Sequence, residues 1–411
     1  MKANSLEKNK IHILLLEGVD QSAVDAFRED GYSDVEYHLK SLPEKQLLAA
    51  VRKAAFIGIR SATQLTAAVF EAAEKLVGVG CFCIGTNQVD LAAAQQKGVP
   101  VFNAPFSNTR SVAELVIAET IFLMRGVPSR NAAAHRGGWP KTATGSHEVR
   151  GKCLGIVGYG HIGTQVGVLA EGLGMRVIFH DVEKQLVLGN ATQAASLDEL
   201  LEHADVVTLH VPETPLTHNM IGADQLARMK PGAKLINASR GTVVEIEPLA
   251  EALRSERIGG AALDVFPSEP KSGEEFVSPL RGFENVILTP HIGGSTEEAQ
   301  KNIGKEVADK LIRYSNNGST LAAVNFPEVS LPAHAGKHRI LHIHRNQPGV
   351  LSGINAIFSE EKINVAAEYL QTNAQIGYVV IDVDPGERDS TAQLRKRLDG
   401  VPGTIRTRLL Y

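Results

Sequence analysis

Short apolar runs alternate with helix-like stretches over the first hundred residues of the chain. The helix-like stretches, such as 21–29 and 44–53, carry their apolar residues on one side. The apolar runs predict strands at residues 11–16, 35–38, 56–60, 76–81 and 99–103. Strands that alternate with helices imply βαβ units and a parallel sheet.

The same alternation returns in the middle of the chain. Its apolar runs predict strands at residues 153–157, 177–180, 206–210, 234–238, 261–265 and 286–288. Between the two sets of strands, the capping-box pattern at 111–114 predicts a long helix over 111–126. Residues 127–150 are polar and rich in glycine and contain the single Trp139, which predicts an exposed arm or loop. A second long helix is expected over 296–314.

The last part of the chain follows a different order. A polar stretch with Pro and Gly near 316–336 predicts a linker. Beyond it, the pattern predicts a strand, a helix, two strands, a helix and a strand at residues 338–344, 349–361, 363–371, 376–383, 389–399 and 404–410. This βαββαβ order is typical of a ferredoxin-like domain. The predicted fold class is therefore α/β, with two doubly wound parallel-sheet domains and a small ferredoxin-like domain.

Composition narrows the class of protein further. Apolar residues make up 43% and charged residues 21%, and 42 Lys and Arg against 46 Asp and Glu leave a net charge of −4. This balance predicts no nucleic-acid partner. No apolar run is long enough for a membrane span or a signal-peptide core, so no membrane partner and a cytoplasmic location are expected. Three cysteines exclude a disulfide scaffold, and the spacing of the histidines predicts no metal site.

A glycine-rich motif follows the first strand of the second set and precedes an apolar helix. The motif is Gly158-Tyr159-Gly160-His161-Ile162-Gly163. In this context it predicts a dinucleotide site, with the pyrophosphate at the start of the helix. Asp181 ends the next predicted strand, where its carboxylate would bind a ribose diol and repel a 2′-phosphate, so NAD is the expected cofactor. Further cofactor contacts are expected at the later strand ends, from His210, Val211, Pro212, Ala238, Ser239, Arg240, Asp264, His291, Gly293 and Gly294.

Three of the later loops carry residues suited to catalysis. Oxidation of an alcohol by a nicotinamide needs a base for the hydroxyl proton, and His291 suits that role. Glu269 could orient the imidazole and stabilise its cation. Arg240 could bind a substrate carboxylate through two hydrogen bonds and polarise the carbonyl.

With these motifs the sequence resembles the D-2-hydroxyacid dehydrogenases. The segments GIVGYGHIGTQVG, NASRGTVV, LDVFPSEP and LTPHIGGST carry the resemblance, which extends over nearly the whole chain. It implies that an NAD domain (108–296) is inserted in a substrate domain (1–107 and 297–336) and is followed by a regulatory ACT domain (337–411). It is strongest to bacterial three-domain members that oxidise D-3-phosphoglycerate at C2 to 3-phosphohydroxypyruvate, the first step of L-serine biosynthesis.

A substrate with a carboxylate and a phosphate needs cations besides Arg240. Candidates are Arg60 and Ser61 at a strand end, Asn108 and Arg110 at the start of the long helix, and Lys141 in the arm. The resemblance implies that the arm, with Trp139, reaches a neighbouring subunit. Similar enzymes carry cations where this chain has Ala62 and Leu39. Fewer cations would weaken phosphate binding.

By resemblance, the tail binds L-serine through His344, Asn346 and Asn364 at a dimer interface where two tail sheets join edge to edge. Feedback inhibition by serine and a homotetramer would follow. The alternative that the tail serves only to assemble the subunits remains open. So do two other functions, a dehydrogenase for an unphosphorylated 2-hydroxy acid and a non-enzymatic NADH-sensing binding protein.

Overall fold

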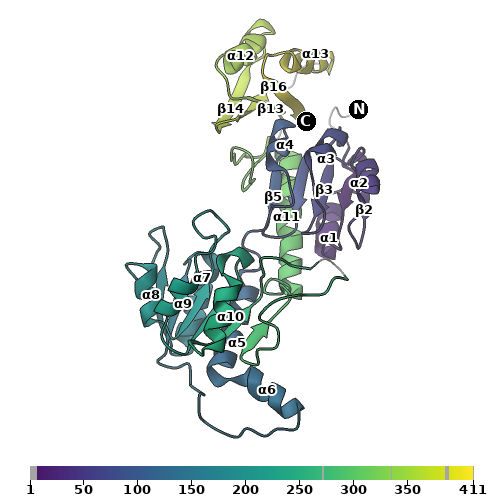
Figure 1. The fold of residues 1–411 in the computed structure, drawn as a ribbon. Coiled ribbons are helices and arrows are strands. Elements are labelled where there is room, and N and C mark those ends of the chain that lie inside the picture. The colour runs from purple at the N-terminus through teal and green to yellow at the C-terminus, as the bar shows by residue number, and fades with distance from the viewer. Residues whose placement is uncertain (1–6, 271–272, 335, 385–387, 411) are drawn as a thin grey trace. The chain divides into compact units, whose positions relative to one another are not determined.

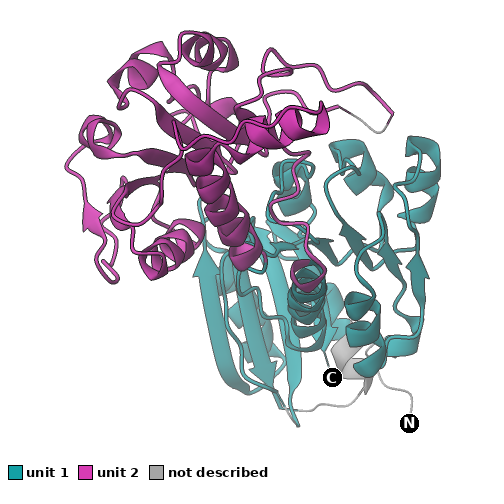
Figure 2. Cartoon of the chain, turned by 90° about the horizontal axis from the view of Figure 1, so that it is seen from below, with its two compact units in different colours: residues 1–107, 300–411 teal, residues 108–299 magenta. Residues whose placement is uncertain are grey.

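The computed structural model describes residues 7–270, 273–334, 336–384 and 388–410 (Figure 1). The chain forms two compact units (Figure 2). Unit 1 consists of Met1–Ser107 with Gln300–Tyr411, and unit 2 of Asn108–Ala299. The middle of the chain is therefore an insertion into unit 1.

Unit 1 contains a five-stranded parallel sheet in the order β2-β1-β3-β4-β5. This is the doubly wound order of flavodoxin-like folds. Its strands are β1 (Ile13–Leu15), β2 (Val35–Tyr37), β3 (Phe56–Ile59), β4 (Gly78–Cys81) and β5 (Val101–Asn103). Its helices are α1 (Gln21–Glu29), α2 (Glu44–Ala50), α3 (Ala67–Ala72), α4 (Leu91–Gln96) and most of α11 (Glu297–Asn317), besides the short 3-10 turn η1 (Lys8–Lys10).

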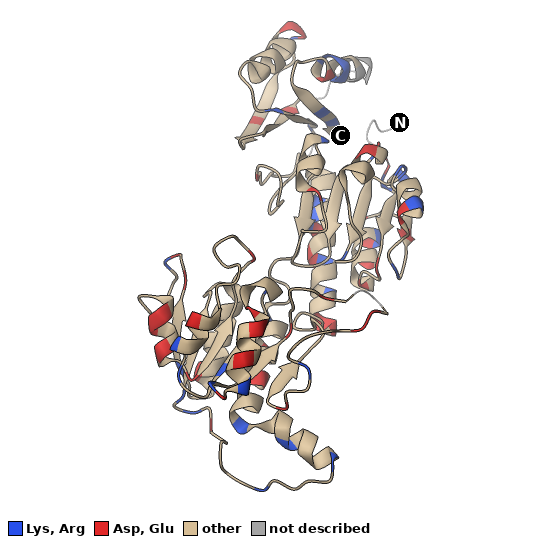
Figure 3. Cartoon of the chain, in the orientation of Figure 1, with Lys and Arg blue, Asp and Glu red and all other residues tan. Residues whose placement is uncertain are grey.

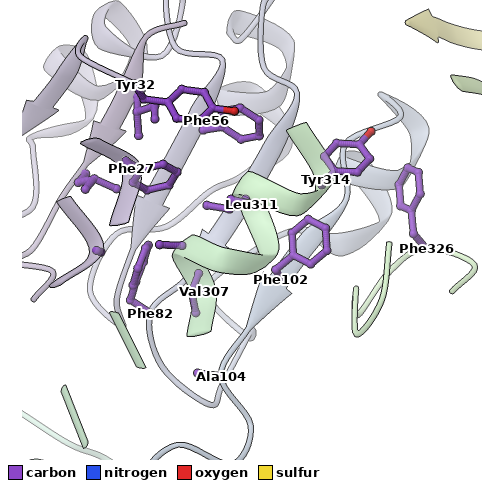
Figure 4. Close-up of a cluster of buried hydrophobic side chains, with 14 of the residues drawn as sticks. Phe27, Tyr32, Phe56, Phe82, Phe102, Ala104, Val307, Leu311, Tyr314 and Phe326 are labelled. Carbon is purple, nitrogen blue, oxygen red and sulfur yellow. The ribbon is translucent and has the colours of Figure 1, made fainter. Parts of the chain in front are cut away.

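The core of this sheet is closed by α11 from the far end of the sequence. Val307, Leu311 and Tyr314 of α11 lie against the buried rings of Phe56 and Phe102 (Figure 4). Strands buried on both faces read as continuous apolar runs, which is why the sequence pattern located them well.

The tail folds as β13 (His338–Arg345), α12 (Val350–Glu360), β14 (Val365–Thr372), β15 (Ile376–Val383), α13 (Arg388–Asp399) and β16 (Thr404–Leu410). Its antiparallel sheet has the order β14-β15-β13-β16. Side chains alternate between the two faces of a strand. On β13, Ile340 joins the core under α12 and α13, whereas Leu341 and Ile343 join the core cluster that contains α11. The tail is therefore part of unit 1 by packing.

Unit 2 contains a seven-stranded parallel sheet in the order β12-β11-β10-β9-β6-β7-β8. This order extends the classical dinucleotide-binding arrangement by one strand. Its strands are β6 (Cys153–Val157), β7 (Arg176–His180), β8 (Thr192–Gln193), β9 (Val206–Leu209), β10 (Ala233–Asn237), β11 (Ile258–Leu263) and β12 (Val286–Leu288). Its helices are α5 (Thr109–Arg125), α6 (Val127–His135), α7 (His161–Gly172), α8 (Leu197–His203), α9 (Ala223–Arg228), η2 (Gly241–Val243) and α10 (Ile246–Arg254). The predicted fold class is confirmed.

Two local predictions were wrong in part. The predicted arm is exposed, as expected, but its first nine residues form the helix α6, with a proline in the first turn and an alanine run behind it, and none of them is buried. The capping box at 111–114 does not form, since α5 already begins at Thr109. The Ser111 hydroxyl instead lies 2.7 Å from the Thr296 hydroxyl.

Both signs of charge are spread over each unit (Figure 3). Within the described part of the chain, no helix has the length and apolar character that crossing a membrane requires.

Candidate active site

The three candidate catalytic residues lie in loops that follow β10, β11 and β12 of unit 2. The carboxyl ends of parallel strands meet at one edge of a sheet, where open α/β folds bind their ligands. Arg240, Glu269 and His291 are thus delivered to one edge from three separate parts of the sequence.

His291 and Glu269 form a direct pair. Nδ1 of His291 lies 3.0 Å from each carboxylate oxygen of Glu269. This hydrogen bond is the main cause that raises the pKa of His291 and lowers the pKa of Glu269. The imidazole side chain is 53% exposed. The pair therefore favours the imidazolium form and leaves the other ring nitrogen, Nε2, for a substrate.

The backbone of the histidine loop is held by Asp264, which is 2% exposed. One carboxylate oxygen accepts hydrogen bonds from the Thr289 hydroxyl (2.6 Å) and the Ile292 N–H (2.8 Å), and the other accepts from the Gly293 N–H (2.7 Å). His291 itself has a φ of +53°, a left-handed conformation that is unusual for a residue with a side chain. Asp264 thus stabilises the turn that presents His291.

Arg240 lies in a turn that is shaped by Asn237, a residue that the sequence analysis missed. The Asn237 amide donates to the carbonyl of Arg240 (3.0 Å), and its oxygen accepts from the N–H (3.1 Å) and the hydroxyl (2.9 Å) of Ser239. At Gly241 an added Cβ would lie 2.0 Å from the carbonyl carbon of Phe266. This close approach brings the Arg240 turn against the segment that leads to Glu269. The positive charge of Arg240 accordingly contributes to the lowered pKa of Glu269, after the larger effect of His291.

The glycine motif connects β6 to α7, as predicted. Gly158 has a φ of +89°, and a Cβ there would lie 2.5 Å from the carbonyl oxygen of His210. A Cβ at Gly163 would lie 2.2 Å from the carbonyl oxygen of Gly158. At Gly160 an added Cβ would meet no atom of the described residues within 4 Å. The fold therefore explains two of the glycines, whereas the open space at Gly160 fits the close approach of a pyrophosphate to the backbone.

Asp181 follows β7 and is hydrogen-bonded to the backbone of the glycine turn. Its carboxylate accepts hydrogen bonds from the N–H groups of Tyr159 (2.7 Å) and Glu183 (2.9 Å). The Tyr159 ring stacks on Phe179 in the core at a centroid distance of 3.9 Å, so only the backbone of Tyr159 is available to a ligand. Asp181 is placed beside the turn, where a carboxylate could also accept from a ribose diol. The residues present fit NAD.

The glycine geometry gives a matched pair of variants. Gly160→Ala should leave the unfolding midpoint unchanged and weaken NADH binding about tenfold, since the new methyl group meets only the ligand. Gly163→Ala should lower the unfolding midpoint as well, because backbone must move. Thermal unfolding and NADH fluorescence titration measure both effects. Unchanged NADH binding in Gly160→Ala would contradict a cofactor at this turn.

The remaining predicted cofactor residues line the same sheet edge or pack below it. Burial lowers the pKa of His210 to about 3, and its Nε2 lies 2.9 Å from the Thr208 hydroxyl. Ser239 is buried, Val211, Ala238 and Ile162 are half-buried, and His161 and Pro212 are exposed. A Cβ at Gly294 would lie 2.2 Å from the side-chain nitrogen of Asn108. Gly293 and Gly294 thus allow the histidine loop to approach its neighbours closely.

The predicted phosphate ligands Arg60 and Ser61 lie at the carboxyl end of β3 in unit 1. Two residues missed by the sequence analysis hold this strand end. Glu17 has a φ of +65° and accepts hydrogen bonds from the N–H groups of Ala62 and Thr63, both at 2.8 Å. Gln88 is buried and donates to the Arg60 carbonyl at 2.6 Å. A carboxylate two residues after the end of β1 was the available signal for Glu17.

The other predicted substrate residues belong to unit 2. Asn108 is buried against Gly294. Arg110 is exposed, and its Nε donates to Glu114 at 2.6 Å. Lys141 is exposed, and so is Trp139, at 86%.

The three predicted effector residues do not converge within one chain. Asn346 donates from its amide to the Asn373 carbonyl (2.7 Å), at the turn between β14 and β15. Asn364 precedes β14 and donates to Asp384 (3.3 Å), at the other end of the same strands. The eight residues of β14 separate these ends by about 23 Å. His344 is 4% exposed, opposite Gly377 and near the Asn346 end.

Comparison with known proteins agrees with this geometry. The family model of the NAD-binding domain of D-isomer specific 2-hydroxyacid dehydrogenases matches residues 117–293, and a model of the AHAS small subunit-like ACT domain matches residues 340–406.

Full-length relatives are also similar. D-3-phosphoglycerate dehydrogenase of Escherichia coli is 62% identical over 408 residues, 99% of either chain, and that of Haemophilus influenzae is 60% identical over the same shares. The crystal structure of D-lactate dehydrogenase with NAD⁺ from Lactobacillus jensenii superposes with a TM-score of 0.64 at 27% identity, over 74% of this chain and 97% of that one. The chain therefore belongs to the D-isomer specific 2-hydroxyacid dehydrogenase family, in the branch whose full-length members are named D-3-phosphoglycerate dehydrogenase.

Proposed function

We propose that the chain is an NAD-dependent D-3-phosphoglycerate dehydrogenase that forms 3-phosphohydroxypyruvate, the first step of L-serine biosynthesis. The observation that carries this proposal is the His291–Glu269 pair beside Arg240, at the sheet edge that also bears the glycine turn. A protein that only sensed NADH would have no use for a paired imidazole. The choice of D-3-phosphoglycerate as the substrate rests on the full-length relatives, which are named D-3-phosphoglycerate dehydrogenase.

In this proposal, Nε2 of His291 accepts the proton of the C2 hydroxyl as hydride leaves C2. Glu269 holds Nδ1 and stabilises the imidazolium that forms. Arg240 binds the substrate carboxylate and the C2 oxygen with its guanidinium fork. NAD⁺, when bound, supplies the hydride acceptor. Asp181 would bind its ribose diol and disfavour NADP.

The phosphate end of the substrate is assigned to Arg60 and Ser61, with Arg110 and the partner's copy of Lys141 as further cations. Support comes from the Glu17 and Gln88 contacts, which fix the strand end that carries Arg60. Asn108 is assigned a supporting role, because its side chain is buried against Gly294.

Glu269→Gln tests the proposed role of the pair through pH. Reduction of the 2-oxo acid needs the imidazolium, so kcat/KM is highest at low pH and falls as pH rises through the pKa of His291. Because Glu269 raises this pKa, the glutamine variant should lose activity at a lower pH than the wild type. Steady-state kinetics over a pH series measure the shift. An unmoved alkaline limb would contradict the assignment.

The protein is also proposed to be a cytoplasmic homotetramer that L-serine inhibits. Two surfaces support assembly, namely the exposed edge strand β14 and the exposed α6 with Trp139. Two separate self-complementary interfaces generate a closed tetramer. If β14 strands of two chains pair antiparallel, Asn364 of one chain comes next to the His344 and Asn346 end of the other, which yields a serine site from two chains.

Mixed oligomers test this serine site. Asn346→Ala and Asn364→Ala should each abolish inhibition by L-serine while turnover persists. Oligomers formed by mixing the two variants should regain part of the inhibition, because some interfaces then contain one intact site. Inhibition curves of 3-phosphohydroxypyruvate reduction measure this. No recovery on mixing, with subunit exchange verified, would contradict a shared site.

The substrate itself is tested by competition. With NAD⁺ present, D-3-phosphoglycerate should be oxidised at far lower concentration than D-lactate. Preferred oxidation of the unphosphorylated acid would replace the proposed substrate, and cofactor binding without turnover of either acid would indicate a binding protein.

A further inference from the structure

A buried carboxyl group in unit 2 has no role in the mechanism described so far. Glu119 lies in the middle of the buried face of α5 and is 2% exposed. Neither of its carboxyl oxygens has a hydrogen-bond partner within the described residues. A buried polar group without a partner costs folding free energy, so its presence in the core calls for an explanation.

The position of Glu119 on α5 relates it to the histidine loop. Val112 and Leu115 lie two turns and one turn before Glu119 on α5. A Cβ added at Gly293 would lie 3.6 Å from the side chain of Val112 and 3.7 Å from that of Leu115. Gly293 donates its N–H to Asp264. The buried face of α5 therefore runs from the His291 loop, past Asp264, to Glu119.

The charge of Asp264 acts on Glu119. Burial, and after it the negative charge of Asp264, raises the pKa of Glu119 to about 8. Among the described helices and strands, α6, α7, β10 and β11 pack most extensively against α5. They carry Arg130, His135, His161, Glu171 and Lys234, and none of these contributes to the shift.

From this arrangement we propose that Glu119 is a positioning residue that acts as a neutral acid. Its neutral carboxyl group places no second negative charge near Asp264, which holds the His291 loop. When Glu119 loses its proton, two negative charges share the buried region behind this loop, and the three hydrogen bonds from Thr289, Ile292 and Gly293 to Asp264 are disturbed. The inference rests on the proposed function for its catalytic consequence, but not for the charge state of Glu119.

Glu119→Gln tests the catalytic consequence. The variant should reduce 3-phosphohydroxypyruvate like the wild type at about pH 7. Near pH 9, where about nine-tenths of Glu119 is ionised, it should keep about tenfold more of its activity than the wild type. The alkaline decline of log kcat/KM should have a slope approaching two in the wild type and one in the variant, since His291 titrates in both. The exposed Glu251→Gln, in the same unit, is the matched control. Coinciding profiles of Glu119→Gln and wild type would overturn the proposal.

The charge state is tested without turnover. A raised folded-state pKa means that Glu119 makes the wild type lose stability as pH rises from about 4.5 to about 8, and this contribution is absent from Glu119→Gln. The difference between their urea midpoints should therefore grow over this range and then stay level. In an Asp264→Asn background it should level off at a lower pH, because the neighbouring charge is gone. A constant difference over the whole range would overturn the neutral acid. If the glutamine variant does not fold, Glu119→Met makes the same comparisons.

NADH binding separates a positioning role from a direct contact. Glu119→Gln should bind NADH like the wild type at about pH 7. A several-fold weaker affinity at this pH would mean that the carboxyl group touches the cofactor and would overturn action through Asp264. If the wild type reduces no 2-oxo acid, the proposed function fails, while the stability profiles still decide the charge state of Glu119.

Discussion

Replacing His291 with alanine should lower kcat for reduction of 3-phosphohydroxypyruvate by about 10³-fold, within the range that one general acid contributes. The variant loses both the proton donor and the group that Glu269 holds. NADH affinity should change by less than about twofold, because the glycine turn and Asp181 lie on other loops.

His203→Ala is the matched control, since His203 is an exposed histidine of the same unit on α8. It should retain wild-type kcat. A kcat of His291→Ala within a few-fold of the wild type would remove His291 from the mechanism, and with it the role of Glu269.

Replacing Arg240 should produce the second large loss. Arg240→Gln should lower kcat/KM by about 10³-fold and Arg240→Lys by about 10²-fold, because an ammonium group supplies charge without the two parallel hydrogen bonds of a guanidinium. Its Nη1 donates to the Ser239 carbonyl at 2.7 Å, which fixes the orientation of the fork. A lysine ammonium has three donors in a tetrahedral arrangement, so it lacks the planar fork that gives two parallel hydrogen bonds to the substrate beside that bond.

Steady-state kinetics with varied 2-oxo acid measure this loss. Arg254→Gln is the control, since Arg254 is an exposed arginine of the same unit. Full activity of Arg240→Lys would show that charge alone suffices at this position and would contradict the two-pronged contact.

The sequence was sufficient where burial or a local turn dictates the pattern. Strands such as β3 and β9 are buried along their whole length, so their apolar runs located them to within a few residues. The two-residue strand β8 is exposed and carries no apolar run, and it was missed. The glycine motif could be recognised because a side chain at Gly158 or Gly163 would clash with nearby backbone. Arg240, Glu269 and His291 could be chosen because their residue types suit the chemistry.

Other features depend on contacts that the sequence does not display. Asn237 accepts a hydrogen bond from a backbone N–H of its own turn, and Glu17 accepts one from a turn distant in the sequence. In the sequence, neither residue differs from any other polar residue that ends or follows a strand. The helix α6 was missed because it has no buried face and hence no periodic apolar pattern. Glu119 lies within an apolar helical stretch, and only its packing against the sheet distinguishes it from an exposed glutamate.

The most direct test of the central claim is the rate of NADH oxidation by the wild-type chain with 3-phosphohydroxypyruvate, compared with pyruvate at equal concentration. The account predicts turnover with the phosphorylated acid and a kcat/KM at least about 10²-fold lower with pyruvate, because binding of the phosphate by Arg60 and its neighbours is lost. Equal or faster turnover of pyruvate would contradict the proposed substrate, and no turnover of either acid would contradict the assignment of an active site to Arg240, Glu269 and His291.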